Sequence, residues 1–489
     1  KLIVKLDWNI NDNNKLVFKN SYVKAEQINA ASLNTRSINF SGRSIFFPST
    51  TNTVSAELNS KFSEKISNQL TIAHTSVLDD RDPLGDPFPS VVIRDGAGRI
   101  SFGSEPFSTG NILEQKITTL TDNLEIYKGK HTYTVGVNLE HSDVRNVFVR
   151  QNFGDYDYGS VADFMSGTVA PIDYDRSYSL QGGQGDDSKG AAEFTMFQVG
   201  AYVQDEVQVS DNFKLSVGLR FDAPIWSDGL VNDSFNNTTV GLLEAQGKDL
   251  QGARVGEGVS TSIHVSPRIG FNWNVKGEYN TQVRGGFGVF TSRVPLVWPG
   301  AVYNNNGMAI AAADQGDLPA GVNFIADPFG QPVGAAVGSG QLGGDINLFS
   351  KNFKLPQVFK VNLAVDQKLP FWGLIASVDF LYNKNVNAVY YENLNLKDAT
   401  QFQSGTGDTR PFYNRNDRID PTYFGIYLGS NTSKGHSWNG SLSITKPNTN
   451  GFAGSFSYSY GDSQTIFEGT SSQNSSQWRN QLSVNGKNS

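Results

Sequence analysis

The chain of 489 residues contains no cysteine and only 3 methionines. The absence of cysteine excludes a disulfide-bonded scaffold and any metal site built from thiolates, and it is compatible with an oxidising compartment. Acidic residues outnumber basic ones, with 47 Asp and Glu against 40 Lys and Arg, so the net charge is −7. A surface able to neutralise phosphates is therefore not expected, which argues against a nucleic-acid partner.

Long hydrophobic runs are also lacking. No segment approaches the roughly 20 consecutive apolar residues that a membrane-spanning helix needs, so a helical membrane protein is excluded. A membrane-spanning strand, in contrast, needs only about 9–11 residues of which every second one is apolar. The composition suits strands, because Gly (50), Phe (32) and Tyr (18) are abundant.

Strict alternation is clearest in residues 213–222, where apolar side chains occupy the odd positions from Phe213 to Phe221 and polar or small ones the even positions. One face of this segment is apolar and the other polar, as in a strand with two different environments. Residues 197–209 alternate in the same way, and only Ser210, Asp211 and Asn212 separate the two segments. Turn-forming residues between two alternating segments predict a β-hairpin.

The same unit recurs along the chain and predicts about fourteen strands in seven hairpins. The paired segments are 2–10 with 15–27, 54–62 with 70–77, 124–126 with 133–139, 197–209 with 213–222, 269–275 with 283–289, 359–365 with 378–380, and 438–444 with 452–460. Turns within hairpins are short, whereas residues 149–194, 223–262, 295–355 and 397–432 form long connections between hairpins. Regular alternation of short and long connections is typical of transmembrane barrels and uncommon in soluble domains.

These observations predict an all-β fold, a transmembrane antiparallel β-barrel with long extracellular loops. In a bilayer the sheet must close on itself, with its apolar face toward lipid and its polar face toward the lumen. The polar side chains assigned to the lumen include Lys214, Arg220, Asp222, Arg284, Lys360 and Asp366. A soluble β-sandwich, whose polar face would contact water, explains the alternation of single strands equally well.

Aromatic residues near the expected strand ends suit the girdles that barrels place at the two membrane interfaces. They are Trp8, Tyr127, Tyr133, Trp226, Tyr279, Trp372 and Tyr391.

The sequences of two successive expected hairpins resemble those of TonB-dependent receptors. Residues 201–207 (AYVQDEV) and 215–222 (LSVGLRFD) are similar to the "Y-x-Q-D-E … L-x-x-G-L-R-Y-D" hairpin of that family. Residues 266–273 (SPRIGFNW) and 284–290 (RGGFGVF) resemble the next hairpin of that family. Its first strand begins with "S-P-R-x-G", and its second strand carries "R-x-G-x-G-x-F". Residues 291–295, 360–369 and 431–435 are similar to the Oar-like branch of these receptors.

The resemblance implies an outer-membrane protein of a Gram-negative bacterium, with a barrel of 22 strands filled by an N-terminal plug and opened by the TonB complex of the inner membrane. Residues 1–489 are then expected to form a single barrel domain that is incomplete at both ends, with the plug and the C-terminal strands outside this sequence. The implied function is binding and import of a bulky solute such as a peptide or glycan. The implied partners are outer-membrane lipid, the TonB complex through the plug, and a surface lipoprotein.

Catalytic, cofactor and metal sites are not expected. The histidines His74, His131, His141, His264 and His436 fall on different expected strands or next to turns, without paired ligand spacing. Residues 338–343 match G-x-G-x-x-G, but no strand precedes and no helix follows them, so the geometry of a phosphate-binding loop is missing. Three acid-rich stretches lack the spacing of a calcium loop. They contain Asp79, Asp80, Asp82 and Asp86; Asp155 and Asp157; and Asn414, Asn416, Asp417 and Asp420.

Solute capture is expected on the loops and the upper lumen, because function concentrates on loops held by a rigid frame. The candidates are Trp298, Tyr303, Asn304, Asn305 and Asn306, which combine stacking surface with amide hydrogen-bonding groups. Such residues also serve simply to pack long loops together. Alternatives to a receptor are a passive porin, a surface adhesion barrel, or a secreted β-sandwich protein that binds carbohydrate.

Overall fold

A long, curved wall of antiparallel strands dominates the structure, a computed structural model. It describes residues 1–181, 186–277, 280–333, 344–403, 410–414, 417–449, 451–466, 469 and 471–481. Within these residues, fourteen strands of 10 to 19 residues form the wall. They are β1 (Leu2–Asn11), β2 (Asn14–Asn29), β4 (Ile45–Ser63), β5 (Ile66–Asp80), β9 (Asn111–Lys128), β10 (His131–Phe148), β13 (Ala192–Ser210), β14 (Phe213–Trp226), β15 (His264–Asn274), β16 (Thr281–Thr291), β19 (Gln357–Lys368), β20 (Ile375–Asn393), β24 (His436–Thr449) and β25 (Phe452–Gln464).

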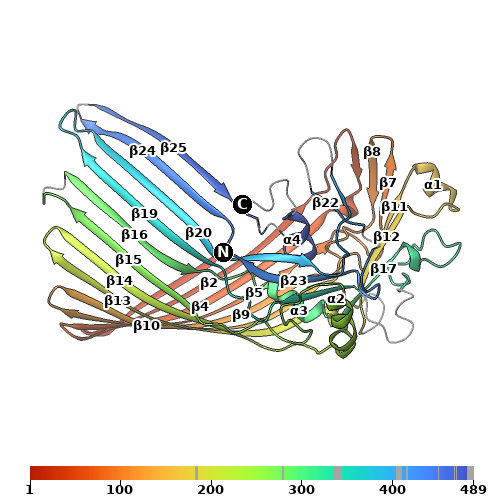
Figure 1. The fold of residues 1–489 in the computed structure, drawn as a ribbon, viewed down its shortest axis with the longest axis horizontal. Coiled ribbons are helices and arrows are strands. Elements are labelled where there is room, and N and C mark those ends of the chain that lie inside the picture. The colour runs from red at the N-terminus through yellow and green to blue at the C-terminus, as the bar shows by residue number, and fades with distance from the viewer. Residues whose placement is uncertain are drawn as a thin grey trace.

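Each wall strand pairs antiparallel with the wall strand that follows it in the chain, from β1 to β25. The seven hairpins predicted from the sequence are confirmed, although several strands extend further than the alternation alone indicated. Figure 1 shows the wall as a trough that is open between β1 and β25. Among the described residues, these two edge strands have no pairing with each other.

The two faces of the wall differ as the alternation predicted. On β14, Val217 and Phe221 are 45% and 42% exposed on the convex face. Their neighbours Arg220 and Asp222 point to the concave face, where the folded loops pack. Two stacked sheets would have buried the face of Val217 and Phe221, so the β-sandwich alternative is wrong.

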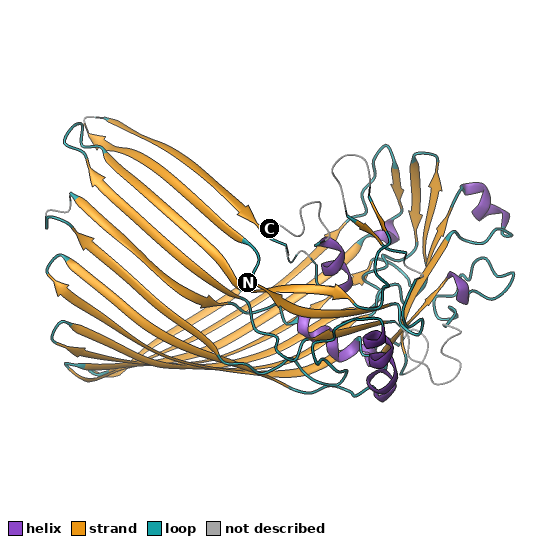
Figure 2. Ribbon diagram, in the orientation of Figure 1, coloured by secondary structure: helices purple, strands orange, loops and turns teal. Residues whose placement is uncertain are grey.

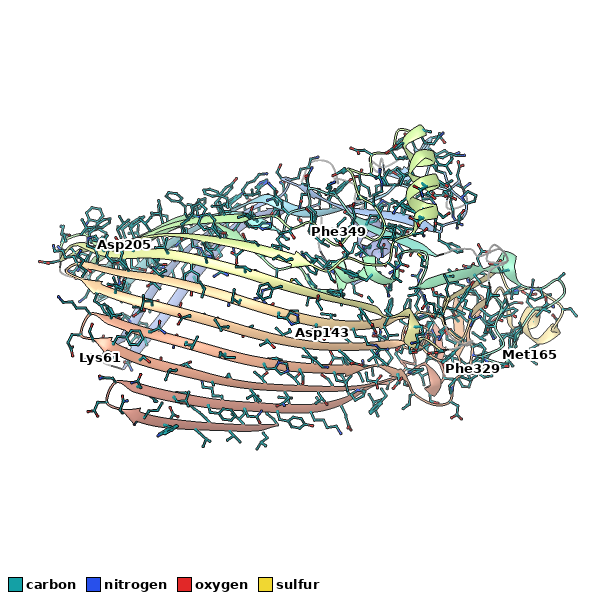
Figure 3. All side chains as sticks on the ribbon, turned by 90° about the horizontal axis from the view of Figure 1, so that it is seen from below. Lys61, Asp143, Met165, Asp205, Phe329 and Phe349 are labelled. Carbon is teal, nitrogen blue, oxygen red and sulfur yellow. The ribbon has the colours of Figure 1, made fainter. Side chains whose placement is uncertain are left out.

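All seven hairpin turns lie at one end of the wall, which we call the turn end, and the long connections gather at the other, the loop end (Figure 2). Figure 3 shows Lys61 and Asp205 at the turn end, and Met165 and Phe329 at the loop end. Residues within the turns stabilise them. In the turn between β1 and β2, the Asn11 side chain accepts a hydrogen bond of 2.9 Å from the backbone N–H of Asn13. In the turn between β9 and β10, Gly129 adopts the positive φ of 62° that a tight hairpin requires.

The long connections are folded rather than structureless. Six short strands form a separate sheet at the loop end, in the order β17 (Ile310–Asp314), β12 (Asp173–Ser179), β11 (Asp155–Tyr158), β7 (Ser90–Asp95), β8 (Gly98–Phe102) and β3 (Ser37–Asn39). Its core contains buried Tyr156, Tyr158 and Tyr174 from one connection, and Phe102 and Phe324 from two other connections pack against them. Pooled aromatic side chains from different connections therefore supply a core that no single connection could form.

Two further strands extend the wall at the loop end. β18 (Asp345–Phe349) runs parallel to β23 (Gly425–Thr432), which pairs in turn with the end of β20. The short strands β6 (Asp82–Pro83), β21 (Gln401–Phe402) and β22 (Pro411–Phe412) complete the sheets. The helices are short: α1 (Val161–Ser166), α2 (Val240–Ala245), α3 (Val297–Asn304), α4 (Asn474–Asn480), the π-helix η3 (Phe235–Thr239), and the 3₁₀ turns η1 (Ser41–Arg43), η2 (Ser188–Gly190) and η4 (Gln315–Asp317). No helix in the described part of the chain is long and apolar enough to cross a bilayer.

The prediction that Trp226 and Tyr391 belong to an aromatic girdle at the membrane interface is wrong. Both are buried in the apolar cluster that joins the concave face of the wall to the loops. Their position explains this: Trp226 is on the same face of β14 as Lys214 and Arg220, so it points away from lipid. Trp8, Tyr127 and Trp372 are exposed, whereas Tyr279 lies outside the described residues.

Candidate functional site

The predicted lumenal residues of β14 lie on the concave face. The ammonium group of Lys214 is 2.5 Å from a carboxylate oxygen of Glu206. The guanidinium group of Arg220 binds the Asp222 carboxylate through Nη2 at 2.7 Å and lies 5.3 Å from the ring centre of Tyr202. The polar face of this hairpin is therefore held in place by its own charge pairs.

Arg284, Lys360 and Asp366 occupy the same face further along the wall. Arg284 contacts two carboxylates, with Nε 3.1 Å from Asp366 and Nη2 3.2 Å from Asp379. Lys360 lies 5.6 Å from the ring centre of Phe290, a cation–π contact. Charged groups of both signs thus cover the concave face.

Three of the five predicted solute-binding residues contribute to packing. Tyr303 is buried, and its hydroxyl donates a hydrogen bond of 2.6 Å to the carbonyl oxygen of Ser227. Asn306 is fully buried, and its Oδ1 accepts from the backbone N–H groups of Met308 and Ala309. Trp298 donates from Nε1 to the carbonyl oxygen of Ser471 at 3.0 Å. These contacts join α3 to the end of β14 and to the segment before α4, and they fix the turn that follows α3.

Asn304 and Asn305, the other two predicted residues, line a cavity of about 740 Å³ at the loop end. Asn304 also packs, because it is 3% exposed and its Nδ2 donates to the carbonyl oxygen of Gly190 at 3.2 Å. The cavity lies between the concave face of the wall, α3, the sheet strands β12 and β17, and the segment before α4. Its lining is rich in amide side chains: Asn29, Asn111, Asn146, Asn304, Asn305, Asn347, Asn474, Gln151 and Gln473. We take this loop-end cavity as the candidate binding site, and solute binding by Asn304 and Asn305 stays a prediction.

Charged residues that the sequence did not single out complete the lining. Arg150 follows β10 and lies 3.9 Å from the Asp345 carboxylate, and its Nη1 donates to Gln473 at 2.9 Å. Burial raises the pKa of Asp345, an effect opposed by Arg150, Arg479 and Arg418. Arg176 of β12 is 1% exposed and donates to the carbonyl oxygens of residues in two connections. In the sequence, the only signal for Arg150 was its place at the start of the long connection of residues 149–194.

The acid-rich stretches are separated in space and bound locally. Ser49 donates to Asp79 at 2.5 Å, Gln151 donates to Asp155 at 3.0 Å, and Arg94 pairs with Asp157 at 3.1 Å. Across the residues that the structure describes, no group of three or more carboxylate or imidazole side chains converges as a metal site would. Asn416 and the glycine-rich residues 338–343 lie outside the described residues.

Comparison with known proteins agrees with this geometry. The family model described as "Outer membrane beta barrel domain" matches residues 1–489. The chain belongs to this family. As an outer-membrane barrel it is located in the outer membrane of a Gram-negative bacterium, and it is not an enzyme. No curated protein matches the chain.

Solved structures of outer-membrane transporters share the fold of this barrel. The outer membrane transporter YddB from Escherichia coli is 12% identical, with a TM-score of 0.55 over 96% of this chain and 48% of that chain. The copper transporter OprC is 9% identical, with a TM-score of 0.52 over 94% of this chain and 54% of that one. The FrpB iron transporter from Neisseria meningitidis is 9% identical, with a TM-score of 0.50 over 94% and 53%. The barrel therefore spans about half the length of these structures, and the Oar-like branch stays a prediction.

Proposed function

We propose that this barrel is part of an outer-membrane receptor that captures a bulky solute in the loop-end cavity and admits it to the lumen. The observation that carries the proposal is the cavity itself, which lies among folded connections and is lined by amide and charged groups of both signs. A pocket of several hundred Å³ with converging polar groups is typical of a specific binding site. The fold shared with outer-membrane transporters supports the same function.

The open edges support a larger barrel in the full-length protein. β1 and β25 each carry an edge without a strand partner among the described residues. Within a bilayer an unpaired edge leaves backbone N–H and C=O groups without hydrogen bonds, at a cost of several kcal/mol for each. We therefore infer that further strands close the barrel to about the 22 that the family resemblance implies, and that a plug and the TonB complex control it. A surface lipoprotein is a further proposed partner at the loop end.

A passive porin is the second candidate function. The inner face of β24 and β25 favours it, because this face is lined by small hydroxyl groups that suit a water-filled pore. They belong to Ser441, Ser443, Ser455, Ser457 and Ser459.

Electrical recording combined with crosslinking in cells distinguishes a receptor from a porin without knowledge of the solute. The full-length protein is inserted into planar bilayers, and it is also crosslinked in intact cells with antibody detection of TonB. A gated receptor gives no steady current and a crosslinked product with TonB. Steady conductance with no such product overturns the receptor and establishes the porin.

A further inference from the structure

We propose that the loop-end cavity recognises an extended peptide that carries a carboxylate. This inference rests on the proposed receptor function, because it names the solute class for the same site. It is carried by buried polar groups that line the cavity and have no hydrogen-bond partner within the described residues.

Asn474 is the clearest of these groups. Its side chain is in the first turn of α4, is 2% exposed, and lines the cavity. Neither its Nδ2 nor its Oδ1 has a hydrogen-bond partner among the described residues. Asn347 of β18 also lines the cavity and is buried, and its Oδ1 has no partner either. Buried polar groups nearly always have hydrogen-bond partners. We therefore expect a ligand to supply the hydrogen bonds that these amide groups lack.

The chemistry of the amide groups favours a peptide backbone. An asparagine side chain offers one acceptor and a pair of donors, which match the N–H and C=O of a single peptide group. Nearby, the strand β17 lines the cavity with Ala311, Ala312 and Ala313, whose small side chains leave room beside the main chain. Phe107, Phe148 and Phe424 provide apolar surface for the side chains of a peptide.

A glycan fits the lining less well. Sugar rings are usually bound on the flat, amphipathic faces of Trp and Tyr. None of the described residues that line the cavity is Trp or Tyr. The candidate residues Trp298 and Tyr303 turn their polar atoms to Ser471 and Ser227 instead.

The carboxylate preference follows from Arg176 and Arg150. Arg176 is buried, forms no ion pair within the described residues, and has no hydrogen-bond partner for Nη2. Arg150 reaches the same cavity and is only loosely paired with Asp345, at 3.9 Å. A guanidinium group in a confined site binds a carboxylate strongly through two parallel hydrogen bonds.

Calorimetry on the full-length protein, purified from outer membranes, tests the proposal. The probes are the tetrapeptide Ala-Ala-Asp-Ala, its carboxylate-free counterpart Ala-Ala-Asn-Ala with an amidated C-terminus, and maltotetraose. We expect the acidic peptide to bind more tightly than the carboxylate-free one by about tenfold, as for one charge-assisted hydrogen bond, and maltotetraose not to bind.

Asn474→Leu is the central variant, because it removes both unpaired polar atoms while keeping a side chain of similar size. We expect about tenfold weaker peptide binding with an unchanged or higher melting temperature, since a partnerless buried amide destabilises the ligand-free protein. Asn439→Leu, the same change on the inner face of β24 outside the cavity, is the matched control and keeps wild-type affinity. Arg150→Gln is expected to reduce the preference for the acidic peptide.

Two results overturn the inference. If Asn474→Leu and Asn439→Leu bind the peptides equally well, the cavity is not the site. If maltotetraose binds and neither peptide does, the solute is a glycan. Neither result changes the conductance or the crosslink to TonB, so failure of this inference is distinct from failure of the receptor function.

Discussion

The ring of Tyr303 on α3 lies parallel to the ring of Phe194 on β13, with 4.7 Å between the ring centres and 8° between the planes. This stack joins the connection of residues 292–356 to the concave face of the wall, and Trp226 packs in the same cluster. The mouth of the barrel is therefore held by apolar contacts between a loop helix and two adjacent strands.

Tyr303→Ala is expected to loosen the loop end while the wall stays intact. Loss of a large buried aromatic side chain costs about 3–5 kcal/mol. Tyr303→Phe keeps the stack and loses only the hydrogen bond to Ser227, which is worth about 1 kcal/mol. Limited proteolysis with trypsin at Arg293 and Lys351 should be fast in the alanine variant and near wild type in the phenylalanine variant. Equal protection of all three proteins would show that the stack does not anchor α3.

An arginine is expected to be tolerated on one face of β24 and not on the other. Leu442 is on the convex face beside Val378 and Tyr458, whereas Ser441 faces Asp379 across the concave side. Leu442→Arg places a charge in lipid, at about 2–4 kcal/mol near the membrane centre, while Ser441→Arg gains an acidic neighbour. Folding yield into lipid vesicles, read from the shift in gel mobility on heating, measures the difference. Similar yields for both variants would contradict the assigned faces.

The lack of native cysteine makes an accessibility test direct. Single cysteines at Ser216 and Val217 of β14 differ by one residue and point to opposite faces. A charged maleimide applied to intact membranes should label Ser216→Cys through the aqueous lumen and leave Val217→Cys unlabelled in lipid. Labelling of Val217→Cys alone would reverse the two faces of the wall. A matched pair at Ser443 and Leu442 repeats the test near the open edge.

Stability at the loop end is expected to depend on pH through Asp345. Burial raises the pKa of this carboxyl above its ordinary value of 3.8, so the folded protein binds its proton more tightly than the unfolded chain. The contribution of Asp345 to stability therefore increases as the pH falls from neutral through the raised pKa, and it levels off below the ordinary value. Asp345→Asn should be at least as stable as wild type at pH 7, and the advantage should shrink toward pH 4. A difference in melting temperature that does not change with pH would contradict the assignment.

The wall was predictable from sequence because the alternation of apolar and polar residues in each strand reflects the environments of its two faces. At Phe213 to Asp222, lipid on one side and polar surroundings on the other impose a period of two, which is visible without any knowledge of neighbouring strands. The turn at Ser210 to Asn212 was equally local. This is why the hairpins and the face of Arg220 and Asp222 could be assigned, although strand ends such as Ile45 could not.

The loop end was less predictable because its contacts are distant in sequence. Tyr156 meets Phe324 and Gln331, and Arg150 meets Gln473, across separations that no local pattern records. Asn304 to Asn306 form one uninterrupted run, yet Asn306 is buried in a turn, Asn304 is buried at the edge of the cavity, and Asn305 is the most accessible of the three. Composition drew attention to this segment, but whether each side chain packs or lines the cavity depends on residues in other connections, and solute binding by the segment stays a prediction.

The parallel ladder of β18 and β23 has a mechanical consequence for access to the mouth. Five residue pairs, from Asp345 with Gly425 to Phe349 with Gly429, join two long connections. In the sequence, the hairpin of β19 and β20 separates these two connections. Asn306 bridges to Ile346 on the same strand. Neither connection can move outward alone without breaking this ladder. In the proposed receptor, a solute that displaces one connection would therefore have to displace the other as well.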